Sequence, residues 1–134
     1  MPVIRIVAAL IVDEQQRVLL VRKAGTTVFM QPGGKYEPGE TARQALVREL
    51  HEELGLVVAE AQLEHLGSFE AVAANEAGHT VEAEVFRAPL TGTPGVQAEI
   101  VELLWALPAA SGHLAIAPLT TDRIFPLLIA AAEF

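Results

Sequence analysis

The chain has 134 residues, about half of them apolar, which suits one compact domain (1–134) with a single core rather than two. Its formal charge of −8 excludes a broad nucleic-acid-binding surface, because neutralising the phosphates of a polymer needs clustered Lys and Arg; a small phosphorylated ligand with a metal ion stays open. There is no cysteine, so a disulfide framework, a thiolate zinc site and a cysteine nucleophile are excluded together.

The same composition bears on where the chain works. The lack of cysteine fits a reducing compartment. The apolar residues 3–12 include Arg5 and lead to Asp13 without a small-residue cleavage signal, so we read them as a strand and not as a secretion signal. Because no stretch is long enough to span a membrane, we expect a cytoplasmic, soluble protein with no membrane partner.

Two β-branched and apolar runs, residues 4–12 and 17–21, open the chain. The polar residues 13–16 between them predict a turn, so we expect an N-terminal β-hairpin. A short apolar piece at 28–30 follows. Beyond it, the glycines and prolines between residues 32 and 39 predict a loop without regular structure.

The clearest predicted helix begins after Thr41, because Thr41 and Gln44 have the spacing of a capping box and Leu46, Leu50 and Leu54 recur every fourth residue. Gly55 is expected to end it as a left-handed C-cap. The remaining predicted elements are strands at 63–73, 80–88 and 100–107 and a last helix at 122–132. This order predicts an α+β layered fold.

The predicted helix carries Glu49, Glu52 and Glu53 close together, because residues three and four apart share one helix face. Like charges at this spacing cost about 0.2–0.5 kcal/mol per pair, and acids near a helix C-terminus also oppose its dipole. The acidic arc overlaps the apolar arc, which places the carboxylates at the core boundary. A divalent cation would relieve the repulsion, and oxygen ligands favour Mg²⁺ or Mn²⁺. The alternative is an ordinary solvated acidic face.

The loop and the helix together match a known motif. Gly34 is followed after five residues by Glu40, and after seven more by Arg48-Glu49-Leu50; Glu52-Glu53 and Gly55-Leu56 complete the pattern. This 23-residue span resembles the Nudix box at every fixed position. The resemblance implies the Nudix fold, a mixed β-sheet sandwiched between α-helices, with a loop–helix–loop that binds metal and pyrophosphate.

The resemblance also assigns roles to residues. It implies that three helix carboxylates, those of Glu49, Glu52 and Glu53, are metal ligands and water activators. It also implies that the Gly33 carbonyl is a further ligand. It implies that Gly34, Glu40 and Gly55 are structural in the motif, and that Glu40 and Arg48 pair to tie the loop to the helix. The alternative for Arg48 is a surface partner of Glu52 at i,i+4.

The activity implied is Mg²⁺-dependent hydrolysis, with Mn²⁺ as a substitute, of a pyrophosphate bond in a nucleoside diphosphate linked to another group. Such a reaction requires charge neutralisation, an in-line water and removal of its proton. The resemblance therefore gives catalytic roles to four residues of the box: Arg48, Glu49, Glu52 and Glu53. Glu49 is the first choice for orienting or deprotonating the water, although Nudix enzymes differ in which glutamate serves.

Signals outside the box are weaker. Arg22, Lys23 and Lys35 flank the loop and are candidates for phosphate contacts, each with a solvated charge as the alternative. Phe29 and Trp105 are candidates for stacking on a base, although single aromatics on strands more often belong to the core.

A further acidic ligand is expected near the start of the last strand, where Nudix enzymes often place one. Glu99 is the first choice, with Glu102 and Glu76 as alternatives and a strand-edge acid as the ordinary interpretation. The four histidines lack metal-ligand spacing, so we treat them as structural or solvated.

Nudix members that prefer ADP-ribose, NADH, coenzyme A or diadenosine polyphosphates often carry an additional short motif downstream of the box. We recognise none of these motifs between residues 57 and 88, so the substrate class is inferred by elimination. The chain most resembles the small MutT-like group, which hydrolyses nucleoside triphosphates, oxidised ones included, to monophosphate and pyrophosphate. The alternatives are an ADP-sugar or another nucleoside diphosphate derivative, and a nucleotide-sensing module without catalysis. Asp122 or Thr121 is a candidate for reading a purine edge, with helix N-capping as the alternative. Nudix proteins are often dimers, which leaves a homodimer open.

Overall fold

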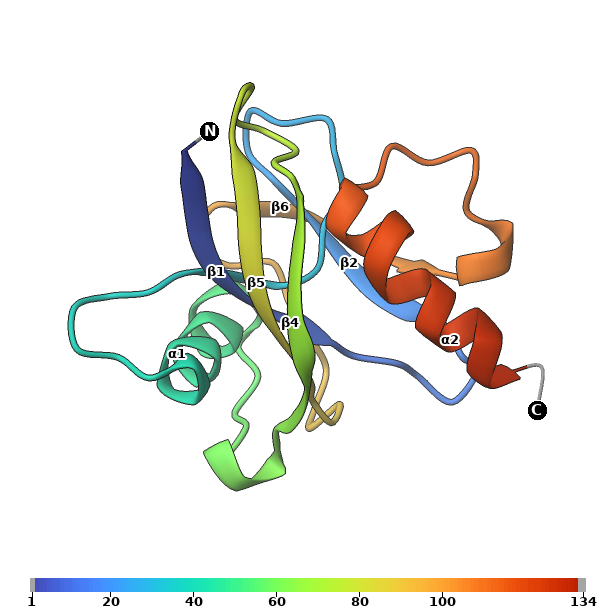
Figure 1. Cartoon of the computed structure of the whole chain (residues 1–134). Helices are drawn as coiled ribbons and strands as arrows, with labels where there is room; N and C mark the ends of the chain where they lie inside the picture. The colour runs from blue at the N-terminus through green and yellow to red at the C-terminus, as the bar shows by residue number, and fades with distance from the viewer. Residues whose placement is uncertain (1, 133–134) are drawn as a thin grey trace.

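The computed structural model describes residues 2–132 (Figure 1). Its strands are β1 (Val3–Leu10), β2 (Val18–Lys23), β3 (Gly33–Lys35), β4 (Glu64–Val72), β5 (Thr80–Arg87) and β6 (Ile100–Ala106). Its α-helices are α1 (Ala42–Leu54) and α2 (Phe125–Ala132), accompanied by short helical segments η1 (Glu60–Gln62), η2 (Pro108–Ala110) and the π-helical η3 (Leu119–Ile124). Within this described part of the chain, no helix is long and apolar enough to cross a membrane.

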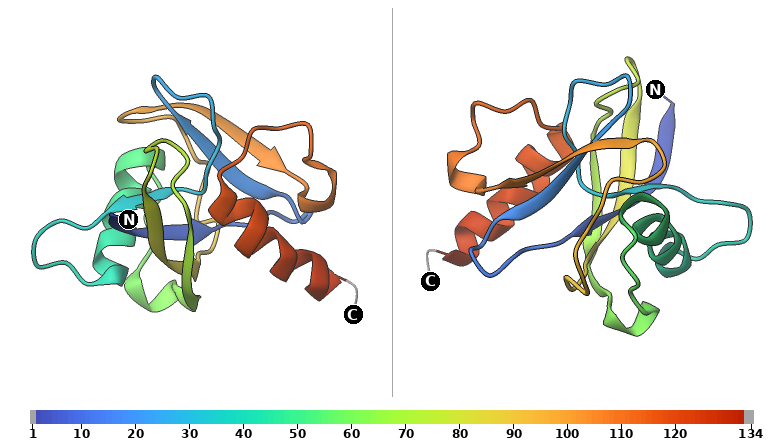
Figure 2. Two further views of the ribbon diagram at one scale, coloured as in Figure 1. Left: turned by 45° about the horizontal axis from the view of Figure 1, so that its top comes forward. Right: turned by 180° about the vertical axis from the view of Figure 1, so that it is seen from behind.

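The strands form two sheets. A four-stranded sheet has the order β3-β1-β5-β4, in which β1 and β5 run parallel and the other pairs run antiparallel. A two-stranded antiparallel sheet joins β2 to β6. The predicted α+β class with a mixed sheet is confirmed, and Figures 1 and 2 show α1 and α2 on opposite sides of the strands.

The predicted N-terminal hairpin is wrong beyond its turn. The turn itself closes, because the Asp13 N–H donates to the Arg17 carbonyl at 2.9 Å and Val12 forms a single bridge with Val18. After that bridge the two strands diverge, since β1 pairs with β3 and β5 while β2 pairs with β6. Adjacent apolar runs therefore belong to different sheets.

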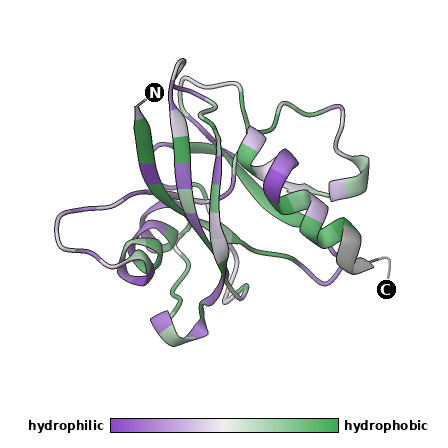
Figure 3. Cartoon of the chain, in the orientation of Figure 1, coloured by the Kyte–Doolittle hydropathy of each residue, from purple (hydrophilic) through white to green (hydrophobic). Residues whose placement is uncertain are grey.

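Burial on both faces explains why these runs are continuously apolar. Val7 and Ala9 of β1 belong to a core cluster shared with the apolar side of α1. Ala8 and Leu10 belong to a second cluster, which includes Phe125 at the start of α2. Hydrophobic colours dominate β1 and β2 in Figure 3, whereas hydrophilic colours mark much of the loop that leads into α1.

The prediction of a loop without regular structure at residues 32–39 is wrong at Gly33–Lys35, which pair with β1 as strand β3. Gly33 has a φ of 151°, and a Cβ there would lie 2.0 Å from the Val7 carbonyl oxygen. The glycine therefore permits a close strand pairing that a side chain would block.

Helix α1 matches its prediction closely. The Thr41 hydroxyl accepts from the Gln44 N–H and the Gln44 side chain accepts from the Thr41 N–H, so the capping box is present. Gly55 ends the helix with a φ of 70°. The C-terminal helix was predicted to begin at 122, but helical structure begins earlier, at Leu119 after Pro118. Thr121 and Asp122 therefore lie inside a helical segment, and their predicted N-capping role is wrong.

Candidate active site

A cavity of about 580 Å³ lies between α1, strands β1 and β3, the β4–β5 turn and the segment before β6. Charged side chains form one part of its wall, called the charged part here: Lys23, Lys35, Glu37, Arg48, Glu49, Glu52, Glu76 and Glu99. Aliphatic side chains form its apolar part: Ile4, Ile6, Met30, Val72, Val81 and Leu119. Ile6, Val81 and Leu119 pack with the second core cluster, on the side of β1 that faces away from α1.

Arg48 holds the loop and the helix together at the edge of the charged part. Its guanidinium donates to both carboxylate oxygens of Glu40, at 2.7 and 2.8 Å, and to the Lys35 carbonyl at 3.1 Å. It also donates to Glu49 at 2.8 Å and to Glu52 at 3.2 Å. Hydrogen bonding to Arg48 lowers the pKa of Glu40 to about 2, so Glu40 is strongly held in its ionised form.

Glu53 is in the opposite situation, because it is a buried acid without an arginine partner. Only 2 % of its surface is exposed, and its Oε1 accepts from the Gly33 N–H at 3.0 Å. Burial raises its pKa to about 7, with Glu49 and Glu99 adding to the rise while the Gly33 N–H and Lys23 oppose it. Among residues 2–132, no positively charged side chain donates a hydrogen bond to this carboxylate, and Lys23 acts on it only from nearby.

Glu49 lies between these two environments. Its side chain is 14 % exposed, and burial raises its pKa although the hydrogen bond from Arg48 opposes the rise. The backbone of Gly34 passes directly beside it, since a Cβ on Gly34 would lie 2.8 Å from the Glu49 carboxyl carbon. Glycine at this position therefore lets the loop approach the helix carboxylate closely. Glu52 is half-exposed, so the three helix acids span the core boundary as the sequence predicts.

The segment before β6 docks on the end of α1. The Gly95 and Gln97 N–H groups donate to the Leu54 and Glu53 carbonyls at 3.0 and 3.1 Å. Ala98 adopts a left-handed φ of 53°, which is unfavourable for a residue with a side chain. Glu99 follows and lines the cavity. The two alternatives to Glu99 have other partners: Glu102 pairs with Arg22 at 2.9 Å and Glu76 with Lys35 at 3.6 Å.

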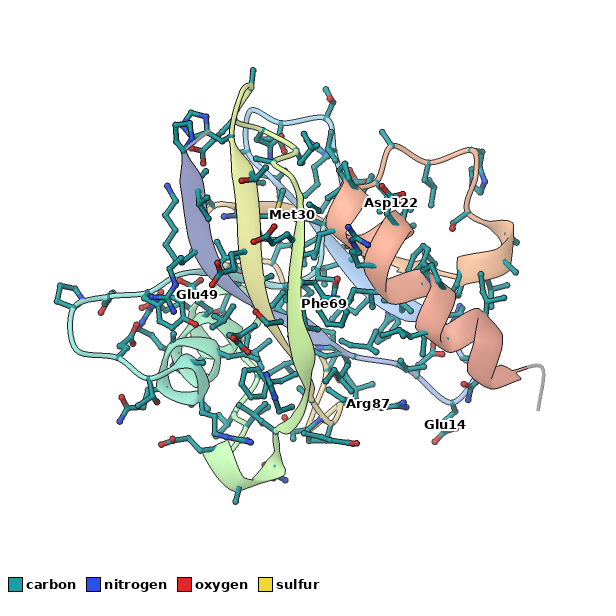
Figure 4. All side chains as sticks on the ribbon, viewed as in Figure 1. Glu14, Met30, Glu49, Phe69, Arg87 and Asp122 are labelled. Atoms are coloured by element: carbon teal, nitrogen blue, oxygen red, sulfur yellow. The ribbon has the colours of Figure 1, made fainter. Side chains whose placement is uncertain are left out.

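The other predicted substrate contacts divide into two groups. Lys23 and Lys35 line the cavity. Lys23 lies near enough to Glu49 and Glu53 for its charge to oppose the rise in pKa of both carboxyl groups. Of the described residues, those that line the cavity do not include Arg22, Phe29 or Asp122. Figure 4 shows Glu49 on α1 and Asp122 far from it, in the η3 segment that leads into α2.

Each residue outside the cavity has another environment. Arg22 donates to Glu102 and to the Thr26 carbonyl, so its guanidinium is held at the β2–β6 pair. Phe29 packs with the second core cluster, and Trp105 packs with the first. Asp122 is exposed and accepts from the Thr121 hydroxyl at 3.1 Å.

Sequence reasoning missed Gln31 and Thr120, two buried polar residues that line the cavity. The available signal was the polar Gln31 immediately after the apolar piece at 28–30. Thr120 gave a weaker signal, because Asp122, two residues downstream, is the more strongly polar residue of the same stretch.

The donor set fits a hard divalent cation by its chemistry, since Glu49, Glu52, Glu53 and Glu99 offer carboxylate oxygens. As they stand, Arg48 engages Glu49 and Glu52, and among residues 2–132 no group of three or more acidic or histidine side chains already surrounds a common point. Each of these Arg48 bonds engages one carboxylate oxygen, so binding a cation there requires the glutamates to bring their other oxygens toward a common point.

The sequence of this chain is similar to those of known proteins, and one family model matches most of it. The family model described as the NUDIX domain matches residues 2–127. The RNA pyrophosphohydrolase of Legionella pneumophila is 46 % identical over 50 residues, which are 37 % of this chain and 29 % of that protein. The 8-oxo-dGTP diphosphatase of Haemophilus influenzae is 39 % identical over 72 residues, which are 51 % of this chain and 53 % of that protein. The matched part thus spans between about a third and about half of these relatives.

Among solved structures, that of the Escherichia coli ORF135 protein has a TM-score of 0.70 and 32 % identity, covering 99 % of this chain and 91 % of that chain. The family model covers nearly the whole described chain, and this structural likeness extends over the same span. The predicted resemblance to small MutT-like members is confirmed, and the chain belongs to the Nudix family.

Proposed function

We propose that this protein is a Mg²⁺-dependent pyrophosphohydrolase that cleaves a nucleoside triphosphate to monophosphate and pyrophosphate. The observation that carries the proposal is the charged part of the cavity, where Glu49, Glu52 and Glu99 line one wall with Lys23 and Lys35. Carboxylates suit a divalent cation, and lysines suit phosphate oxygens. The names of the two relatives, an RNA pyrophosphohydrolase and an 8-oxo-dGTP diphosphatase, support hydrolysis of a phosphoanhydride bond.

The proposed metal ligands are Glu49, Glu52 and Glu53, with the Gly33 carbonyl and Glu99 as further ligands. When bound, Mg²⁺ or Mn²⁺ would neutralise the diphosphate and make water more acidic. The Gly33 N–H fixes one oxygen of Glu53, which leaves the other oxygen as a ligand. Burial supports this assignment, because an ionised carboxylate at this depth needs a positive partner.

Glu49 is proposed to accept the proton of the attacking water. It lines the cavity beside the proposed metal ligands Glu52 and Glu99, where an ionised carboxylate can accept a proton from water. Arg48 orients it, since the same guanidinium that donates to Glu49 is anchored by two bonds to Glu40. Lys23 and Lys35 are proposed to contact phosphate oxygens from the cavity wall.

The test is a panel of nucleotides incubated with the protein and Mg²⁺, with the products separated and identified. The panel contains the common ribo- and deoxyribonucleoside triphosphates, 8-oxo-dGTP and ADP-ribose. Monophosphate and pyrophosphate from a triphosphate support the proposal, whereas turnover of ADP-ribose alone supports the ADP-sugar alternative. Activity should vanish in EDTA, return with Mg²⁺ or Mn²⁺, and increase toward alkaline pH. Full turnover in chelator would overturn the metal assignment.

A further inference from the structure

Ala98, immediately before the proposed metal ligand Glu99, has a backbone conformation that its side chain disfavours. Within residues 2–132, only Ala98 and Gln16 combine a positive φ with a side chain, at 53° and 63°. In this left-handed region the Cβ atom crowds the following carbonyl oxygen, which costs free energy. The surrounding structure must therefore hold Ala98 in place, and backbone outliers of this kind cluster at functional sites.

Ala98 and Glu99 are the two central residues of a tight turn, called the 97–100 turn here. The Ile100 N–H closes the turn by donating to the Gln97 carbonyl at 3.0 Å. Ala98 has a positive φ and Glu99 does not, which is the pattern of a type II′ turn. Glycine is the usual residue at the first central position of that turn. Ala98 therefore occupies a position where glycine would form the same turn without strain.

Two further backbone bonds fix the 97–100 turn between α1 and the end of β2. On one side, the Gln97 N–H donates to the Glu53 carbonyl at 3.1 Å, so the turn is attached to the backbone of another proposed metal ligand. On the other side, the Glu99 carbonyl accepts from the Ala24 N–H at 2.8 Å. The backbone of Glu99 is consequently held on both sides, and the left-handed residue 98 joins the two anchors.

The pairing of β2 with β6 adapts to this turn. The register shifts between Arg22 and Lys23, so Val101 of β6 is left out of the pairing. Bulges of this kind re-aim side chains and are common next to active sites. Lys23 and Glu99, which flank the shift on the two strands, both line the cavity. The bulge and the turn together bring one cationic and one acidic side chain to the same wall.

Burial does not explain the strained conformation. Residues 96–99 are all exposed, so the 97–100 turn adds no side chain to the apolar core. Its visible result is the placement of Glu99, which lines the charged part of the cavity. A local strain that serves no packing is expected where it orients a functional group.

We propose that Ala98 is a positioning residue, whose left-handed backbone holds the Glu99 carboxylate at the charged part of the cavity for binding a divalent cation. This inference rests on the proposed function for the identity of the ion and for Glu99 as one of its ligands. It adds how the chain holds that ligand, and it makes the affinity for Mg²⁺ depend on the conformation of residue 98.

The test is calorimetric titration of Mg²⁺, without nucleotide, into the wild type, Ala98→Gly and Ala98→Pro. Proline fixes φ near about −65° and cannot form the 97–100 turn, so the Kd for Mg²⁺ should rise by about ten- to a hundredfold, as for residues that orient metal ligands. Glycine adopts a positive φ freely, so Ala98→Gly should bind Mg²⁺ as tightly as the wild type or more tightly. Unchanged affinity in folded Ala98→Pro would overturn the inference.

A double-mutant cycle tests whether the effect is transmitted through Glu99. In a Glu99→Gln background, Ala98→Pro should cause no further loss of Mg²⁺ affinity, because the carboxylate that it displaces is already neutral. An equal loss in both backgrounds would show that the turn acts on other ligands, such as Glu53, and would overturn the inference. If Ala98→Pro does not fold, Ala98→Val takes its place in the cycle, because a β-branched side chain disfavours a positive φ. The expected rise in Kd is then about two- to fivefold.

The matched control for Ala98→Val is Gln16→Val. Gln16 is exposed, has the same left-handed conformation in the turn after β1 and, among the described residues, is not part of the cavity wall. Gln16→Val should lower the melting temperature as Ala98→Val does and leave the Kd for Mg²⁺ unchanged. If both variants melt earlier and neither changes that Kd, Ala98 is only a strained turn residue and the inference is overturned.

Hydrolysis assays on the same proteins separate this inference from the proposed function. If the wild type binds Mg²⁺ with the expected dependence on residue 98 but hydrolyses no nucleoside triphosphate, the inference stands and the proposed function fails. If the wild type hydrolyses triphosphates and folded Ala98→Pro binds Mg²⁺ equally well, the proposed function stands and the inference fails. If the wild type neither binds Mg²⁺ nor hydrolyses any nucleotide, both fail.

Discussion

Glu40 and Glu53, on either side of the same loop, show how differently one kind of side chain can be placed. Two hydrogen bonds from Arg48 keep the pKa of Glu40 near 2, whereas burial raises that of Glu53 to about 7. Glu40 itself has its charge matched by the guanidinium of Arg48. The region around Glu53 has an excess of negative charge at the core boundary. The difference indicates that the first region is built for structure and the second for a positively charged ligand.

The largest expected effect comes from removing charge in the second region. Glu53→Gln keeps the shape and the helix propensity but removes one unit of the charge proposed to hold Mg²⁺. We expect kcat to fall on the order of a thousandfold, because metal-ion catalysis supplies several kcal/mol. In metal-free buffer the melting temperature should stay equal or rise, since a buried charge is removed. Steady-state kinetics and a thermal melt on one preparation measure both.

The control for this variant is Glu64→Gln, which neutralises an exposed acid of β4. It should leave kcat and the melting temperature unchanged. If Glu53→Gln instead destabilised the protein and kept most of the rate, Glu53 would be a structural acid and the contrast with Glu40 would disappear.

The next largest effect is expected in the first region. Glu40→Gln removes the ionised partner of Arg48, so Arg48 loses its anchor to the loop. We expect kcat/KM to fall by about ten- to a hundredfold, as for residues that orient metal ligands, together with a lower melting temperature. A lowered pKa contributes stability above the unfolded value of 4.5, and that stability is lost as pH falls toward 2. The melting temperatures of the variant and the wild type should therefore converge in acid.

An unchanged melting temperature at pH 7 in Glu40→Gln would show that the Arg48–Glu40 pair is not structural. The lowered pKa of Glu40 would then need another explanation.

The pH dependence of folding stability, measured without metal or substrate, tests the same comparison. The folded protein raises the pKa of Glu53 from 4.5 to about 7, so it binds a proton that the unfolded chain releases. Metal-free stability should therefore fall as pH rises from about 4.5 to about 7 and then level off, by up to about 3 kcal/mol from this group. Glu53→Gln should lack this part of the slope. Chemical denaturation of both proteins at several pH values measures it, and parallel curves would contradict the assignment.

The smallest effect is expected at Ala98, in the segment that docks on the end of α1 beside Glu53. Ala98→Gly relieves a left-handed conformation, although glycine also loses more backbone entropy on folding. The two contributions nearly cancel, so we expect a stabilisation of less than about 1 kcal/mol. Ala98→Val should instead destabilise, because a β-branched residue fits this conformation worse than alanine. Equal melting temperatures for the two variants would show that the strain is absent.

Local signals in the sequence predicted the elements whose structure is locally determined. Helix α1 needed only its capping box, its apolar spacing and Gly55, all of which act within a few residues. Strand pairing was harder to predict from the sequence. The runs that form β1 and β2 are apolar on both faces, so periodicity could not show which strands they pair with. Their turn suggested a hairpin, but pairing with distant strands prevailed.

The candidate site divides in the same way. Spacing on α1 predicted that Glu49, Glu52 and Glu53 lie together, because a helix fixes that relation. Gln31 and Thr120 are 89 residues apart, and only the packing of η3 against the sheet brings them together. The predicted role of Arg22 depended on where a side chain points at the end of a strand, and its pairing with Glu102 across β2 and β6 depends on strand register.

The most direct test of the contrast between the two regions is a titration with Mg²⁺ alone, without nucleotide, of the wild type and Glu53→Gln. Calorimetry measures binding, and thermal melts measure stabilisation at millimolar Mg²⁺. If the second region awaits a cation, the wild type should bind saturably and melt at a higher temperature with Mg²⁺, because an ion that binds only the folded state stabilises it. Glu53→Gln should show neither response. Equal binding and equal stabilisation in both proteins would contradict the account.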